Sequence, residues 1–185
     1  SKIDDMSYSF PGQKYLTTIN SSFEHVTGFY SAFMFCTALT NITSACTFKD
    51  VEDGRAMFSG DTSLISFPDT ITFDKVKVAD SMIGGCSNLV HLPANLSGKN
   101  IIDANSMFVM DSSLIKIPTS FNPENLYLCG GMFRGCSALI SIPLINVSNA
   151  SHYHHLVNGC TNLEDFKFKG IGNIAEIEEL SYQDF

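Results

Sequence analysis

The stretch GMFRGCSALISIP at residues 131–143 decides the fold, because similar stretches recur at 25-residue intervals. Residues 106–118 read SMFVMDSSLIKIP, residues 81–93 read SMIGGCSNLVHLP, and residues 56–68 read AMFSGDTSLISFP. The four stretches share a bulky apolar pair, a Cys or Asp, a leucine and a closing proline. They are copies of one repeating unit.

Weaker copies extend the array in both directions, as shown by a leucine that keeps the same place in each copy. A degenerate copy, marked by Phe10 and Leu16, lies at the N-terminal end of the array. The leucines are Leu39, Leu64, Leu89, Leu114, Leu139 and Leu163. A unit this short cannot bury its own apolar face and must stack on its neighbours. We therefore predict a β-rich leucine-rich-repeat solenoid of about seven coils, each with a short helical turn and one or two short parallel strands.

The chain is predicted to form a single domain over residues 1–185. Residues 1–30 are interpreted as a degenerate N-terminal coil or cap, residues 31–168 as the regular repeats, and residues 169–185 as a C-terminal cap. Within that cap, residues 174–180 are the most acidic stretch and keep apolar residues three apart. They are expected to cover the end of the stack, with a docking peptide as the alternative.

Composition excludes several classes of partner. Charged residues make up 16% of the chain, and acids outnumber bases 19 to 11, for a net charge of −8. Such a chain has no cationic field to attract a nucleic acid or an anionic membrane surface. It also has no apolar run long enough for membrane insertion. We expect a folded chain whose binding depends on its repeats.

The repeat unit [A/S/G]-M-F-x-G-C-[ST]-x-L-x-x-[I/L/F]-P resembles the BspA-type leucine-rich repeat, and especially its 25-residue relatives in mycoplasma surface lipoproteins and in proteins of gut Bacteroidales and their phages. The resemblance runs from about Phe10 to Phe168. It implies a stacked solenoid outside the cell, at a bacterial cell surface or on a virion, often concerned with adhesion or partner binding. It implies no shared catalytic residues.

Each position of the unit has a physical interpretation. The Met-Phe segment is long enough for one helical turn, and the glycine that follows suits a left-handed residue where that turn reverses. Phe35 and Met110 replace this glycine, so either the position tolerates negative φ or those repeats carry strain. Leu-x-x-Ile is expected to be a strand ended by proline, with a second sheet near 70–73 and 76–78. The glycines are Gly60, Gly85, Gly135 and Gly159.

An internal column of small side chains follows each Met-Phe segment. We expect Asp to accept backbone N–H bonds there and Cys to pack as a small apolar residue. A disulfide between Cys136 and Cys160 is geometrically conceivable, but parallel side chains in register do not point toward each other. Cys46 and Cys129 fall outside the column and are expected to be free. The column consists of Cys36, Asp61, Cys86, Asp111, Cys136 and Cys160.

The residue after each repeat leucine is the main candidate for partner binding. Alternation along a strand would turn this position outward and make an apolar stripe, whereas a bend at the leucine would put it inside. The position after it varies and completes the candidate surface. The candidate residues are Ile65, Ser66, Val90, His91, Ile115, Lys116, Ile140 and Ser141.

No motif for a catalytic nucleophile or for phosphate binding is present, so the chain is predicted not to be an enzyme and to need no cofactor. His152, His154 and His155 are the one cluster of potential metal ligands. We predict a protein-interaction or adhesion module that binds a surface protein or glycan. The alternatives are a structural component of a phage particle or other large assembly, which would include a homo-oligomer, and metal binding at the histidines.

Overall fold

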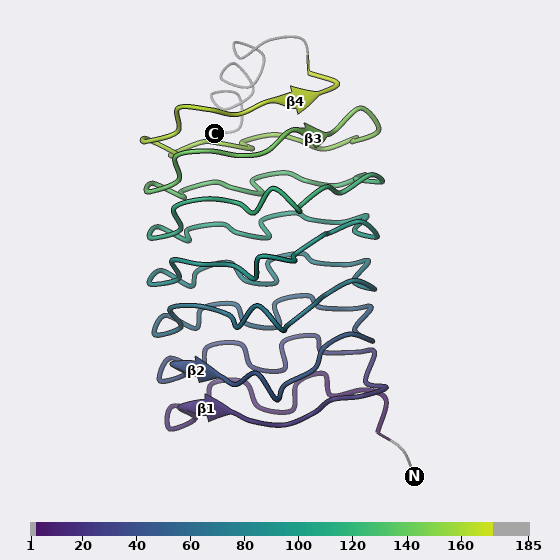
Figure 1. Cartoon of the computed structure of the whole chain (residues 1–185), viewed down its shortest axis with the longest axis vertical. Coiled ribbons are helices and arrows are strands. Elements are labelled where there is room, and N and C mark those ends of the chain that lie inside the picture. The colour runs from purple at the N-terminus through teal and green to yellow at the C-terminus, as the bar shows by residue number, and fades with distance from the viewer. Residues whose placement is uncertain (1–2, 172–185) are drawn as a thin grey trace.

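The computed structural model describes residues 3–171, and over them the chain winds repeatedly around one long axis (Figure 1). Each winding takes about one sequence repeat. Single-residue parallel bridges join neighbouring windings: Gly28 pairs with Asp53, Asp53 with Val78, and Val78 with Asp103. The 25-residue period of the sequence is thus the length of one circuit. Residues 172–185, which hold most of the predicted C-terminal cap, lie outside the described range.

Regular secondary structure is sparse. Over residues 3–171 there is no helix, and the strands are two residues long. Strand β1 (Thr18–Ile19) pairs in parallel with β2 (Asn41–Ile42), and β3 (Ile145–Asn146) pairs in parallel with β4 (Phe168–Lys169). The two pairs are separate two-stranded sheets at opposite ends of the stack, as Figure 1 shows.

The predicted fold class, a β-rich leucine-rich-repeat solenoid, is therefore wrong. It required a helical turn and one or two parallel strands in every coil, whereas the described residues contain no helix and only these two small sheets. What the repeats form instead is a series of windings built from hydrogen-bonded turns. The reason lies in the Met-Phe segment.

That segment hydrogen-bonds in two alternating directions. The N–H groups of Gly54, Ala56, Phe58 and Gly60 each donate to a carbonyl in the next winding, 24 residues further on, at 2.9 Å. The N–H of the residue between donates locally instead, as Met57 does to the carbonyl of Gly54 at 3.1 Å. A helix would need every N–H to donate four residues back. We call this segment the turn row; its copies are residues 29–35, 54–60, 79–85, 104–110 and 129–135.

Left-handed residues enforce the alternation. Ala56 and Gly60 have φ of 48° and 75°, and a right-handed helix cannot include such values. The left-handed conformation expected of Gly60, Gly85, Gly135 and Gly159 is confirmed. Phe35 and Met110 also adopt it, both at φ 61°, so the interpretation that those two repeats carry strain is the correct one.

The expected strands are reduced to single bridges. Ser66 pairs with His91 and Lys116 with Ser141, without a neighbouring pair to make a strand. The prolines begin turns: the carbonyl of Pro68 accepts the N–H of Ile71 at 3.0 Å, and Pro93 and Pro118 do the same. The second predicted sheet, near residues 70–73 and 76–78, is likewise replaced by turns and by two single-residue bridges of Val78, to Asp53 and to Asp103.

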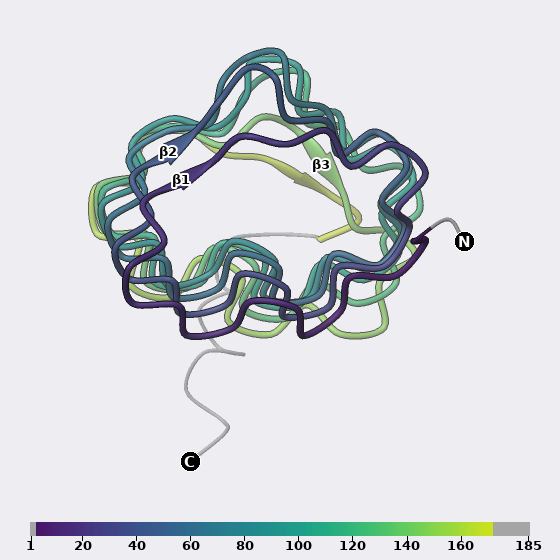
Figure 2. The ribbon, with the colours of Figure 1, turned by 90° about the horizontal axis from the view of Figure 1, so that it is seen from below.

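Aromatic rings fill the space inside the windings. The rings of Phe33 and Phe58, one repeat apart, lie 5.6 Å apart and nearly parallel at 11°, and Phe108 and Phe133 repeat this arrangement. Seen along the stack axis in Figure 2, successive windings follow similar outlines, so equivalent side chains lie above one another. Identical apolar residues one repeat apart therefore pack on each other.

A second aromatic column is interrupted at one winding. Phe48 stacks on Phe73, but the residue one repeat after Phe73 is Gly98. The buried ring of Phe121 lies against this glycine, and a Cβ built on Gly98 would be 2.6 Å from it. Gly98 is also left-handed, at φ 63°, so both its backbone and its surroundings require glycine.

Gly98→Ala should destabilise the fold much more than Gly12→Ala. Both glycines have φ near +65°, but nothing lies within 4 Å of a Cβ at Gly12. The shared backbone strain should cost about 1 kcal/mol in each variant. Displacing Phe121 should raise the cost at Gly98 to about 2–4 kcal/mol. Urea denaturation measures both, and equal losses of unfolding free energy would show that Phe121 is not tightly packed.

Candidate functional site

The residue after each repeat leucine faces outward in the structure. The four leucines that precede these residues, at 64, 89, 114 and 139, are fully buried. By contrast, Ile65, Ile115 and Ile140 have 54%, 38% and 45% of their surface exposed, and Val90 is half-buried. Of the two alternatives that the sequence left open, the outward one is therefore correct. We call these four residues the apolar stripe.

Backbone hydrogen bonds hold the apolar stripe in register. The N–H of Val90 donates to the carbonyl of Ile65 at 2.8 Å, and the N–H of Ile140 donates to the carbonyl of Ile115 at 2.9 Å. The stripe therefore runs along the stack with one member in each winding. These bonds fix Ile65 relative to Val90 and Ile115 relative to Ile140.

Beside the stripe runs the more polar half of the candidate surface. Ser66, His91 and Lys116 are exposed and Ser141 is half-buried. The bridges that join Ser66 to His91 and Lys116 to Ser141 keep these side chains one winding apart. The structure thus brings all eight predicted partner-binding residues onto one face.

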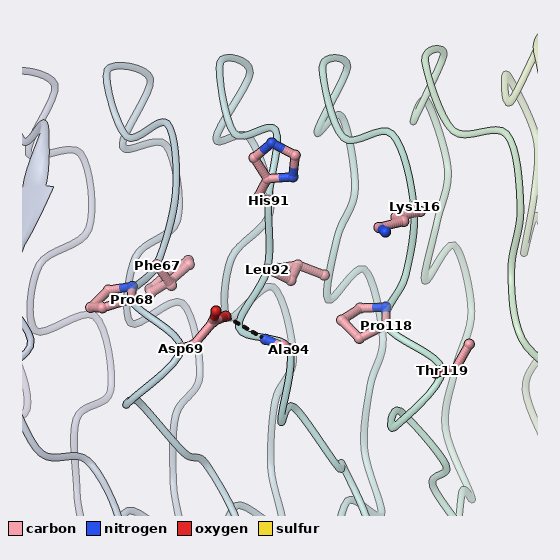
Figure 3. Close-up of a pocket in the computed structure, with 9 residues that line it drawn as sticks. All are labelled: Phe67, Pro68, Asp69, His91, Leu92, Ala94, Lys116, Pro118 and Thr119. Carbon is pink, nitrogen blue, oxygen red and sulfur yellow. Dashed lines mark hydrogen bonds between the residues drawn. The ribbon is translucent and has the colours of Figure 1, made fainter.

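A pocket of about 530 Å³ opens next to this face and spans three windings (Figure 3). Its apolar part comes from the buried side chains of Phe67 and Leu92 and from two of the repeat prolines. In Figure 3, His91 and Lys116 lie on one side of Leu92 and Asp69 on the other. The lining residues are Phe67, Pro68, Asp69, His91, Leu92, Ala94, Lys116, Pro118 and Thr119.

Sequence reasoning found His91 and Lys116 but missed the apolar floor of this pocket. The signal was present: the residue before the proline that closes each of the four repeat stretches is apolar, and in Phe67 and Leu92 it is also large. A second hollow, of about 400 Å³, lies at the far end of the stripe and is lined in part by Ile140 and Glu164. The apolar stripe therefore has a hollow on two sides.

The internal column is built as expected. The N–H of Cys36 donates to Oδ1 of Asp61 at 2.8 Å, and the N–H of Cys86 donates to Oδ1 of Asp111 at 2.9 Å. The thiols donate to carbonyls of an earlier winding, as Cys86 does to Phe58 at 3.1 Å. Cys160 is half-buried and the other five column residues are buried.

All six cysteines are free thiols. The conceivable disulfide between Cys136 and Cys160 is absent, and each of these thiols donates to a backbone carbonyl instead, at 2.9 and 3.0 Å. Cys46 and Cys129 are buried and free, as predicted. Burial raises the pKa of Cys160 to about 11, so this thiol is a poor nucleophile at neutral pH.

Burial favours the neutral form of the two buried carboxyls, Asp61 and Asp111. Burial raises the pKa of Asp61 to about 9, against the lowering effect of the Cys36 N–H, and burial likewise raises the pKa of Asp111 well above its usual value. The second oxygen, Oδ2, is buried in both residues and has no hydrogen-bond partner. A charged carboxylate there would be strongly disfavoured.

The three histidines proposed as metal ligands do not come together as a set. The rings of His152 and His154 lie 6.3 Å apart and nearly perpendicular, and Nδ1 of His152 is 2.8 Å from Oγ of Ser151. Within residues 3–171, no group of three or more His, Cys, Asp or Glu side chains is placed to hold a metal ion.

Comparison with known proteins adds no assignment. No family model, curated protein or solved structure matches the chain. The part of the chain that the structure describes has no helix with the length and apolar character needed to cross a lipid bilayer. The functional argument therefore rests on the geometry of the apolar stripe and the adjacent pocket.

Asp61→Asn should make the protein less sensitive to alkaline pH. Because the folded-state pKa of Asp61 is raised from 3.8 to about 9, its favourable contribution is complete below pH 4 and is lost as the pH rises toward 9. The loss is at most about 1.4 kcal/mol per pH unit. The asparagine keeps an oxygen for the Cys36 N–H and does not ionise.

Thermal melts of both proteins from pH 5 to pH 8.5 should show the melting temperature of the wild type falling more steeply. Asp111 remains in the single variant, so the slope is reduced rather than abolished, and Asp61→Asn/Asp111→Asn should reduce it further. The exposed Asp69→Asn is the control. Parallel melting curves for wild type and variants would contradict the assignment of neutral buried acids.

Proposed function

We propose that the protein is a non-enzymatic interaction module that binds a protein partner through the apolar stripe and the adjacent pocket. The observation that carries this proposal is the exposure of isoleucines in consecutive windings on one face, Ile115 and Ile140 among them. Exposed apolar side chains are common singly, but a contiguous row beside a hollow is typical of interaction sites.

The surrounding architecture suits recognition. Windings tied together by backbone hydrogen bonds present their outward side chains at fixed spacing, so little conformational entropy is lost when a partner binds. Variation of the outward residues between repeats, as between Ser66, His91 and Lys116, gives each winding its own chemistry. Specificity would then come from the order of residues along the stack.

The setting that we propose is a bacterial cell surface or a virion, with adhesion as the biological role. The support for it is the resemblance of the repeat unit to BspA-type repeats, which concerns the sequence pattern and not the corrected fold class. The net charge of −8 is consistent with a protein partner and opposes binding to a polyanion.

Ile115→Asp combined with Ile140→Asp should abolish capture of partners without unfolding the protein. The wild type, immobilised, is exposed to extract from its native source, and the proteins retained are compared with those retained by the variant. Ile102→Asp is the matched control, because Ile102 is 46% exposed and lies outside the stripe. Burying a carboxylate in an apolar contact should weaken binding by a factor of about 100 or more.

Thermal melts of each variant establish that the fold is intact. Capture that persists in the double variant would refute the proposal, and loss of capture with Ile102→Asp would place the binding surface elsewhere. Light scattering of the purified wild type tests the alternative of self-association: a stable oligomer that the double variant converts to monomers would make the partner a second copy of this chain.

A further inference from the structure

The three lysine ion pairs within residues 3–171 share one geometry. A lysine pairs with an acid that lies one repeat earlier, directly across the gap between two windings. The ammonium nitrogen of Lys75 is 2.7 Å from Oδ1 of Asp50, and that of Lys77 is 2.8 Å from Oε2 of Glu52. A third, longer pair joins Lys49 to Glu24 at 3.8 Å. In these three windings, an acid of the preceding winding thus neutralises the lysine.

Lys116 is one of the described lysines without such a pair. The residue one repeat earlier is His91, and the residue one repeat later is Ser141, so the neighbouring windings supply no carboxylate. Over residues 3–171, no acidic side chain lies within 4.0 Å of the Lys116 ammonium. Its charge is therefore left for solvent or for a ligand, at the edge of the pocket (Figure 3).

Asp69, the acidic residue in the lining of this pocket, already accepts a backbone hydrogen bond. Oδ1 of Asp69 accepts the backbone N–H of Ala94 at 2.9 Å. In Figure 3 this bond lies on the opposite side of Leu92 from Lys116. The side of the pocket that faces the apolar stripe therefore carries the ammonium of Lys116 and the imidazole of His91, with no carboxylate between them.

The rest of the pocket favours an apolar group. Phe67 and Leu92 form a floor that is 4% and 7% exposed, and Pro68 and Pro118 flank it. A volume of about 530 Å³ accommodates one large side chain together with part of the backbone that bears it. A cation next to an apolar floor matches a ligand in which a carboxylate stands next to an apolar side chain.

We propose that this pocket binds an acidic segment of the partner protein, with an apolar side chain of the segment against Phe67 and Leu92 and a neighbouring carboxylate facing Lys116 and His91. The inference rests on the proposed function and names the chemistry of the partner at the same site. A nucleic acid is disfavoured, because it must neutralise many phosphates and this face offers one lysine on a chain of net charge −8.

Selection from a random heptapeptide display library on the immobilised wild type tests this chemistry. The enriched peptides should carry Asp or Glu within two positions of Leu, Ile or Phe. The most enriched peptide, made synthetically, should bind about tenfold more weakly to Lys116→Gln, which keeps a polar side chain, one atom shorter, but removes the charge. Lys116→Arg should restore most of the affinity.

Lys77→Gln is the matched control, because Lys77 is also exposed and already has Glu52 as its partner. Its affinity for the peptide should equal that of the wild type. Raising the salt concentration should weaken peptide binding to the wild type and leave binding to Lys116→Gln nearly constant, since only the former includes the ion pair.

The possible results separate this inference from the proposed function. Peptides that need Ile115 and Ile140 but lack acids, or that bind Lys116→Gln as tightly as wild type, would overturn the acidic-segment proposal and leave the interaction surface standing. Failure to enrich any peptide would also overturn it, while partner capture by the wild type and not by the Ile115→Asp/Ile140→Asp variant would still support the proposed function.

Discussion

The alternation of hydrogen-bond direction in the turn row is the constraint on which the rest of this structure depends. Every second N–H of residues 54–60 is donated to the next winding, and those of Met57 and Ser59 are donated three residues back. The first set ties the windings together, and the second prevents both a helix and a regular strand. The alternation also requires left-handed residues, such as Ala56 and Gly60, at fixed places in each repeat.

The buried column of cysteines and aspartic acids completes this arrangement at the end of each turn row. The position needs a small side chain, because the chain bends sharply around it, and a polar group, because backbone N–H and carbonyl groups are enclosed with it. A thiol meets the need by donating to a carbonyl, as Cys136 does to Phe108. A protonated carboxyl, as in Asp61, meets it by accepting an N–H. The two residue types are therefore interchangeable here despite their different chemistry.

The candidate site is a by-product of the same geometry. With the repeat leucine buried, the residue after it lies outside, and register between windings turns one such residue per repeat into a row. The pocket lies at the windings in which the residue before the closing proline is large and buried, as Phe67 and Leu92 are. At the edge of this pocket Lys116 has His91 one repeat earlier, and no acidic side chain within residues 3–171 pairs with it.

The sequence by itself determined the period of the windings and the glycines with positive φ. These follow from patterns within one repeat, which neighbouring repeats copy. Only the tertiary structure decided that the Met-Phe segment turns rather than coils into a helix, that strands shrink to bridges, and that Ile115 points outward. Each of these features depends on which backbone N–H groups donate to the next winding and which donate within their own winding. Contacts between residues about 25 apart in the sequence determine this pattern.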